Sequence, residues 1–199
     1  LLTALAPQPV AAAVDFDLGI KAGVSLAKIK WSDETEATCN LLQPVFGVFA
    51  SFNLTKNIAI QPEIYLLTQG GTDEYTFDLD TYAFKALYRY IHIPVLAKVR
   101  LMNEGKFRPI LFAGPAVGIL LSAHEKHYTN GVLDSDDDVK EYLKNTNFSL
   151  VFGAGVEYMM DKLMLILDVR YDMGLAGIEA IGTDQLKTRA LMFLVGVGF

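Results

Sequence analysis

The sequence has little cysteine, little basic charge and no long apolar run, and each shortage excludes a class of protein. A single cysteine, Cys39, excludes an internal disulfide framework. Lys and Arg number 17 against 23 Asp and Glu, for a formal net charge of −6. This balance argues against a nucleic-acid partner, because such a surface needs a basic patch to neutralise phosphates.

No segment predicts a transmembrane helix. The longest mostly apolar stretch, 109–123, is interrupted by proline and glycine and is shorter than the roughly 18 residues that a spanning helix needs. Yet 52% of the 199 residues are hydrophobic and the mean hydropathy is +0.29. A chain this apolar is either a very apolar soluble protein or a β-barrel, whose backbone polar groups can all be satisfied inside lipid.

Apolar residues recur with a period of two, which predicts strands. The length of the chain fits one domain. We expect an all-β, closed, up-and-down antiparallel transmembrane β-barrel of about eight strands, each long enough to cross a bilayer when tilted. The expected strands are 16–26, 42–53, 58–69, 87–100, 108–122, 147–158, 162–174 and 188–199.

The connections between these strands alternate in length along the chain. Short turns are expected at 53–57, 101–107 and 159–162, and longer polar loops at 32–41, 70–82, 123–146 and 175–187. This alternation is typical of outer-membrane barrels, with short periplasmic turns and long outward loops.

The first residues suggest export. Residues 1–13, LLTALAPQPVAAA, end in small residues and resemble the end of a secretory signal peptide. We therefore expect 1–13 to be a signal-peptide remnant and 14–199 to be the barrel domain; a disordered leader on a soluble protein is the alternative.

Two features indicate that the apolar face points to lipid. Ten glycines fall on the polar face, where small residues make room in a lumen that side chains of eight strands just fill. The apolar face is nearly free of charge, and its exceptions, Arg89 and Arg189, lie near the long-loop ends, where charge costs little.

The polar face carries charges of both signs, and buried charges must be paired. We expect Glu63, Glu157 and Asp168 to pair with arginines at 100, 108 and 170. This network would be a structural plug, or alternatively a proton or ion path. Its expected members are Asp17, Lys21, Glu63, Lys98, Arg100, Arg108, Glu157, Asp168, Arg170 and Asp172.

Several segments resemble a known family. Segment 191–199 has alternating apolar residues and ends in an aromatic one, and it resembles the last strand of outer-membrane barrels; its pattern residues are Phe193, Val195, Val197 and Phe199. Segments 90–98, 61–63, 113–115 and 153–157 resemble the outer membrane protein β-barrel domain family, also called porin family or PorT-like. The resemblance implies a Gram-negative outer membrane, contact with its lipid and lipopolysaccharide, and recognition of the last strand by the barrel-assembly machinery.

Catalytic patterns are poor. His92 is expected to be packed on the lumen face, and His124, Glu125 and His127 form the only acid–histidine group at the loop rim. An H-x-x-H spacing without a third ligand does not make a metal site, and the acidic run 134–138 lacks the glycine and bidentate Glu of an EF-hand. We expect no catalytic residue, no metal and no cofactor.

The sequence therefore predicts a non-enzymatic outer-membrane barrel that acts as a membrane anchor or binding module through its extracellular loops, with a ligand that the sequence does not identify. Three alternatives remain open: a narrow ion or small-solute channel, an outer-membrane enzyme such as a hydrolase or acyltransferase with a site at the loop rim, and a soluble lipid-binding barrel.

Overall fold

The computed structural model describes residues 15–30, 41–102, 104–178 and 187–199, and within them it contains nine strands and one short 3-10 helix. The signal-peptide remnant predicted at 1–13 and Cys39 lie outside the described residues. The elements are β1 (Phe16–Lys30), β2 (Leu41–Asn53), β3 (Ile58–Phe77), β4 (Asp80–Arg100), β5 (Phe107–Thr129), β6 (Val132–Asp138), η1 (Lys140–Tyr142), β7 (Thr146–Met159), β8 (Met164–Gly174) and β9 (Lys187–Gly198).

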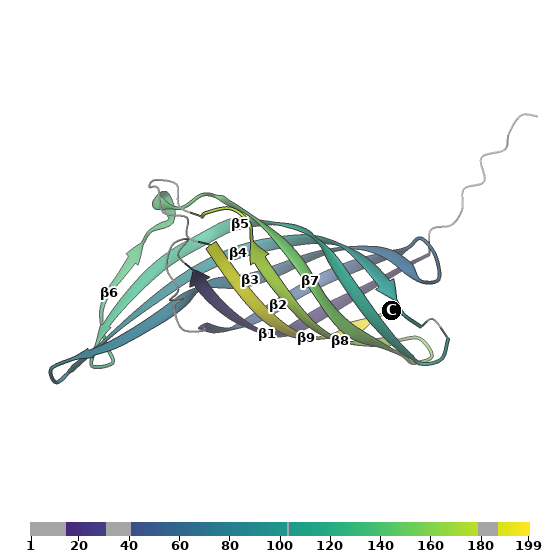
Figure 1. Cartoon of the computed structure of the whole chain (residues 1–199), viewed down its shortest axis with the longest axis horizontal. Coiled ribbons are helices and arrows are strands. Elements are labelled where there is room, and N and C mark those ends of the chain that lie inside the picture. The colour runs from purple at the N-terminus through teal and green to yellow at the C-terminus, as the bar shows by residue number, and fades with distance from the viewer. Residues whose placement is uncertain (1–14, 31–40, 103, 179–186) are drawn as a thin grey trace, which may run out of the picture.

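Eight of the strands form a closed ring. Their order is β4-β3-β2-β1-β9-β8-β7-β5, and β5 pairs back onto β4 (Figure 1). Every pairing is antiparallel, and the first and last strands close on each other with Leu26 opposite Leu191. The predicted closed up-and-down barrel is confirmed. Among the described residues, no helix has the length and apolar character needed to cross a membrane.

The alternating sequence pattern places apolar side chains outside and polar ones inside. In β8, for example, Leu165, Leu167 and Val169 are exposed, whereas Asp168 and Arg170 are buried. A soluble barrel would show the reverse arrangement, so the apolar exterior fits lipid rather than water. The apolar residues that break the pattern are buried in the lumen: Phe49, Leu67, Phe112 and Ile166.

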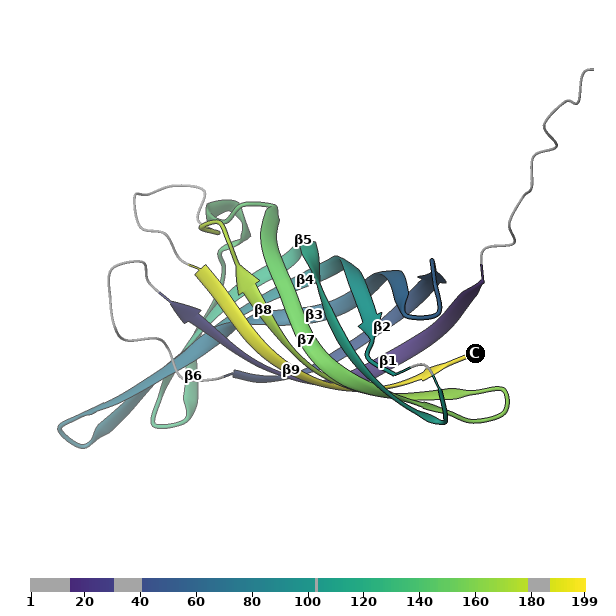
Figure 2. The same cartoon turned by 45° about the vertical axis from the view of Figure 1, so that its right-hand side comes forward.

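The two ends of the barrel differ. The short turns and both ends of the described chain lie at one end, and β3, β4, β5 and β6 extend well past the other (Figures 1 and 2). The predicted short turns are confirmed at 53–57, 101–107 and 159–162. Short turns mark the periplasmic side of such barrels, so the long extensions are extracellular.

The loops predicted at 70–82 and 123–146 are wrong for most of these residues, because the chain continues there as strand. The β3–β4 hairpin runs to Phe77 and Asp80, and β5 runs to Thr129 and turns into β6. Asn130 and Gly131 form the β5–β6 turn with φ of 51° and 79°. Positive φ at both central residues is the geometry that Asn-Gly favours in a two-residue hairpin.

We call residues 72–85 and 124–138, the parts of these two hairpins that project past the ring, the projecting sheet. β5 holds it together: its residues up to Ile119 pair with β7, whereas His124–Thr129 pair with β6. The strand order β3-β4-β5-β6 is therefore a four-stranded extension of one side of the barrel wall.

Candidate functional site

The centre of the lumen is a cluster of two cations and two carboxylates. Lys21 Nζ lies 3.0 Å from Glu63 Oε1 and 2.6 Å from Asp168 Oδ2. Arg170 Nη1 lies 2.5 Å from Glu63 Oε2, and its Nη2 lies 2.5 Å from Asp168 Oδ2. These four residues come from β1, β3 and β8, so the cluster joins opposite walls of the barrel. All four are buried, and their charges balance.

Aromatic rings flank these cations. The Arg170 guanidinium lies 5.3 Å from the ring centroid of Tyr65 and 5.0 Å from that of Phe112, and Lys21 Nζ lies 5.0 Å from that of Phe49. Cation–π contacts are strongest where water is excluded, so the rings help to retain the buried charges.

The lumen glycines make room for these rings. Gly19, Gly47 and Gly153 lie directly opposite Phe49, Tyr65 and Phe112 on the neighbouring strands. A Cβ at any of the three glycines would collide with that ring and with backbone of a neighbouring strand. The rings can therefore lie flat across the wall, over the glycines, and face the central charges.

A second charged group lies nearer the periplasmic end. Lys98 and Arg100 both bond to Glu157, at 2.6 Å and 2.8 Å. Lys98 also donates to Gln61 Oε1 at 2.7 Å, and Arg100 Nη2 lies 3.7 Å from Asp17 Oδ2. This group closes the lumen below the central cluster.

The third group, on the extracellular side, is built around His92. Its Nε2 lies 3.2 Å from Ser149 Oγ and 3.1 Å from Asp172 Oδ2. Ser, His and Asp together suggest a hydrolase triad, but a triad needs the serine and the carboxylate on opposite ring nitrogens. Here both partners meet the same nitrogen, and all three residues are buried.

Apolar side chains cover the extracellular mouth. Leu143, which precedes β7, and Ile178, which follows β8, pack on Tyr88, Tyr90 and other buried residues of the wall. Lys144 binds this cover at two points, because its backbone N–H donates to Ile178 O and its Nζ donates to Gly177 O. The lumen is thus filled in layers from the mouth to the group around Glu157. Below that group, a hollow of about 670 Å³ lined by Asp17, Arg100 and Arg108 among others lies at the periplasmic end.

Most of the residues expected in the lumen network meet as ion pairs, and one does not. Arg108 makes none of the ion pairs found among the described residues, and its buried Nε has no hydrogen-bond partner. Glu157, which lies directly opposite Arg108 on β7, pairs with Lys98 and Arg100 instead. The pairing of Asp172 with His92 was not expected.

The lumen network also contains side-chain amides, which the sequence analysis missed because it considered charged residues only. Gln61 bridges Lys98 and Glu63, and Asn147 donates to Gln69 Oε1 and Thr188 Oγ1. Their positions in the period-two pattern, on the polar side of each strand, were the available signal.

The rim histidines do not form one site. His124 and His127 lie three positions apart on β5 and so point to opposite faces. His124 Nδ1 lies 3.0 Å from Asp136 Oδ1, whereas the His127 ring packs on Phe84 and Glu125 accepts from the Tyr88 hydroxyl. Across the described residues, no group of three or more His, Cys, Asp or Glu side chains could hold a metal ion.

Asp136 also pairs with Lys126, at 2.9 Å. The hydrogen bond from Lys126 lowers the pKa of the Asp136 carboxyl, and the same bond raises the pKa of Lys126. Both residues lie on the projecting sheet, so this pair fastens β6 to β5 outside the membrane.

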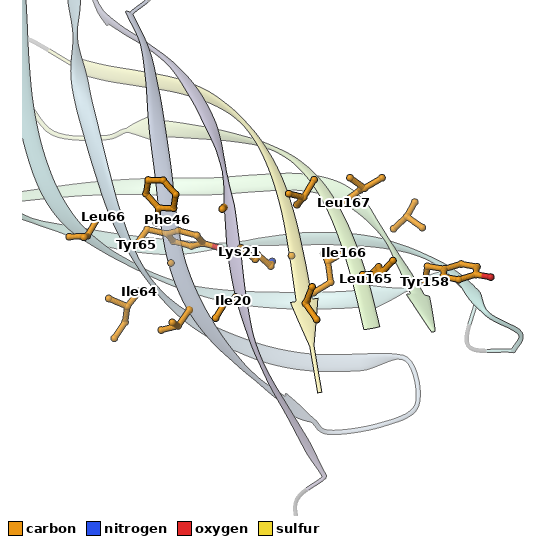
Figure 3. Close-up of a pocket in the computed structure, with 17 residues that line it drawn as sticks. Ile20, Lys21, Phe46, Ile64, Tyr65, Leu66, Tyr158, Leu165, Ile166 and Leu167 are labelled. Atoms are coloured by element: carbon orange, nitrogen blue, oxygen red, sulfur yellow. The ribbon is translucent and has the colours of Figure 1, made fainter. Parts of the chain in front are cut away.

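A hollow of about 1010 Å³ lies on the outer wall, and its lining also includes Lys21 of the central cluster and the neighbouring Tyr65. Apolar side chains from β1, β2, β3, β7, β8 and β9 line it, among them Ile20, Phe46, Ile64 and Leu167 (Figure 3). They belong to the lipid-facing surface, so the hollow is suited to acyl chains.

The last strand completes this surface. Phe193, Val195 and Phe199 are exposed on the outer face of the barrel, and Val197 is half-buried there. Backbone hydrogen bonds join Phe199 and Leu18 in both directions, at 2.9 Å and 3.0 Å.

A closed antiparallel ring with an apolar outside, a charged and filled inside, and short turns at one end defines a transmembrane β-barrel of the outer-membrane type. The family model described as outer membrane protein beta-barrel domain matches residues 8–179, and the chain belongs to this family. Its location is the cell outer membrane.

Neisserial surface protein A shows the same fold, and two further solved structures are similar to this chain. Neisserial surface protein A superposes with a TM-score of 0.53 at 15% identity, covering 92% of this chain and 95% of that chain. Ail, the attachment invasion locus protein of Yersinia pestis in complex with the heparin analogue sucrose octasulfate, gives 0.46 at 14% identity and covers 93% and 99%. The outer membrane protease OmpT from Escherichia coli gives 0.48 at 10% identity and covers 92% and 96%. No curated protein matches the sequence.

Proposed function

We propose that this protein is a non-enzymatic outer-membrane barrel whose wall anchors an extracellular binding surface, the projecting sheet. The observation that carries the proposal is the contrast between the two halves of the molecule. The lumen is closed by paired charges, whereas strands β3 to β6 continue past the membrane as an ordered sheet.

The filled lumen argues against a channel. An eight-stranded barrel leaves an interior just wide enough for side chains. Here Lys21, Glu63 and Arg170 occupy its centre from different strands, each hydrogen-bonded to a partner across the lumen. An ion that passed through would have to break these pairs.

The geometry of the polar residues supports a non-enzymatic role. His92, Ser149 and Asp172 are buried in the lumen and arranged unlike a triad. At the rim, His124 is paired with Asp136, and Glu125 accepts from the Tyr88 hydroxyl.

The proposal also includes two partners that the barrel itself would contact. Outer-membrane lipid and lipopolysaccharide would cover the apolar wall, including the hollow around Ile20 and Leu167. The barrel-assembly machinery would recognise the outer face of β9 at Phe193, Val195, Val197 and Phe199.

Conductance in planar lipid bilayers tests the proposal. The purified full chain should insert without opening steps in the current, because paired side chains occupy the centre of the lumen. A porin reconstituted in the same way is the control for insertion. Stable, repeated conductance steps from the barrel would contradict the proposal and favour the channel alternative.

A further inference from the structure

One face of the projecting sheet combines exposed aromatic rings with carboxylates. Directly opposed residues on neighbouring strands share a face, and Tyr75 pairs with Tyr82 while Asp73 pairs with Phe84. The rows continue across the sheet, with Phe84 opposite His127 and Glu125 opposite Asp137. We call this side, which continues the lumen side of the wall, the inner face.

Two rings of the inner face are open to solvent, whereas Tyr82 is half-buried and Phe84 packs against the apolar cluster of the mouth. Tyr75 is 62% exposed and Phe77 is 68% exposed. Tyr75 and Tyr82 stack with centroids 5.3 Å apart and planes at 19°. Contiguous exposed aromatic groups on a soluble surface usually mark an interaction site, and here they lie in the extracellular part of the chain.

Charge is divided between the two faces. The projecting sheet holds nine Asp and Glu against two lysines, a formal charge of −7, whereas the whole chain carries −6. Both lysines are on the outer face: Lys85 lies opposite Lys126 on β5, and Lys126 lies opposite Asp136 on β6. Lys126 is paired with Asp136, and Lys85 Nζ lies 5.1 Å from the Tyr128 ring centroid. The carboxylates of the inner face have no such cation beside them within the sheet.

On this basis we propose that the inner face of the projecting sheet binds an extended, arginine-rich segment of an extracellular protein or peptide. This inference rests on the proposed function and names the chemistry of its ligand. Guanidinium groups stack on aromatic faces and bond carboxylates in a planar fork, and the inner face offers both groups side by side at Asp73 and Tyr75.

The dimensions fit such a segment. Four strands about 4.8 Å apart span about 14 Å, which an extended peptide covers with four or five residues at about 3.3 Å each. Every second side chain of that peptide would point at the sheet. Its cations could therefore meet the carboxylates at both edges, Asp73 on β3 and Asp137 on β6.

The charge also excludes other partners. A sulfated polysaccharide or nucleic acid would be repelled by this face. A divalent cation alone finds no cage, since the described residues contain no group of three or more suitable ligands.

The test uses the full chain in nanodiscs of neutral phosphatidylcholine and a fluorescent peptide of alternating arginine and serine, with fluorescence anisotropy as the readout. Two exposed ion pairs and their stacking contacts predict that Asp73→Asn with Asp137→Asn weakens binding by about fivefold. Tyr82→Leu keeps the apolar bulk but removes the ring face, and should weaken binding by about threefold.

The matched control is Glu74→Gln with Asp138→Asn. It removes the same charge from the sequence neighbours of Asp73 and Asp137, which lie on the outer face. Binding should change by less than about twofold, since an outer-face charge acts only through solvent. Equal weakening by the two double variants would reduce the effect to non-specific attraction and overturn the proposal, as would tighter binding of a glutamate–serine peptide.

Each variant is first checked for heat-modifiable migration on gels, so that loss of binding is separated from loss of the barrel. Absence of peptide binding by the intact protein overturns the inference but leaves the proposed function standing. That function fails if the bilayer measurement shows conductance.

Discussion

Glu63 and Arg170 are 107 positions apart in the sequence and lie within 2.5 Å of each other across the lumen. Glu63 is also bonded to Lys21, so one carboxylate joins three strands of the ring. This carboxylate therefore links opposite walls of the barrel, which the ladders of neighbouring strands do not join directly.

Glu63→Gln should destabilise the barrel, because it leaves two buried cations facing one carboxylate. Breaking a buried pair in this way typically costs about 3–5 kcal/mol. The free energy of unfolding can be measured in detergent by urea titration with the gel shift as the readout. The double variant Glu63→Gln with Lys21→Met restores charge balance and should recover part of the loss. A double variant less stable than Glu63→Gln would contradict the account.

Gly47→Ala should destabilise the barrel by about 1–3 kcal/mol, the usual cost of overpacking. The added Cβ would meet the Tyr65 ring, which lies over this glycine and against Arg170. The same urea titration measures the change. In a Tyr65→Leu background the penalty should shrink, and an unchanged penalty would show that the ring is not the cause.

The Asp136 carboxyl should titrate below the ordinary aspartate value, because its bond to Lys126 favours the charged form. A lowered pKa means that the stabilisation of the β5–β6 hairpin is fully present above about pH 3.9 and is lost as the pH falls through the lowered value. The raised pKa of Lys126 acts in the opposite range, where stabilisation is lost as the pH rises through that value.

A carboxyl-carbon NMR titration measures this pKa directly. Lys126→Met should move the Asp136 midpoint up toward its ordinary value. Lys85→Met is the control, since Lys85 is on the same face but contacts the Tyr128 ring. Equal midpoints in the protein and in Lys126→Met would rule out the pair.

Phe199→Ala should reduce assembly in cells more than stability in detergent. The ring is 68% exposed on the outer face, so its removal leaves no cavity. If β9 is the recognition segment, less heat-modifiable protein should accumulate in the outer membrane, while the purified variant should unfold at the same urea concentration. Leu167→Ala, also exposed to lipid on β8, is the control. Equal losses for both variants would mean that β9 has no special role in assembly.

The sequence was sufficient for the ring and its two faces, because a period of two directly reports which side chains point inward. Alternation at 162–174 placed Asp168 and Arg170 in the lumen, where the structure has them. The ion-pair partners in the lumen could not be assigned, because pairing across the lumen depends on the order and stagger of the strands. The pattern along one strand does not report either of them. Arg108 illustrates this, since Glu157 faces it on β7 and yet bonds elsewhere.

The projecting sheet was missed although it had a local signal. Residues 123–146 are polar and were expected to be a loop, but Asn130-Gly131 is the strongest short-range indication of a two-residue hairpin. The polar composition of these strands was interpreted as a loop, because the strands lie outside the membrane, where neither face must be apolar. For the lumen glycines, the sequence predicted the face on which they lie. It did not predict that they lie opposite aromatic rings, because that depends on the register between neighbouring strands.

Water access to the lumen is the most direct test of a filled barrel that anchors an external surface. In a background with Cys39→Ser, Ser149→Cys places a thiol in the lumen, where Ser149 is 2% exposed, and Thr76→Cys places one on the projecting sheet. The labelling rates of a small water-soluble thiol reagent are then compared in proteoliposomes. The account predicts rapid labelling at position 76 and almost none at position 149 until the barrel is unfolded. Similar rates at the two positions would show a water-filled lumen and contradict it.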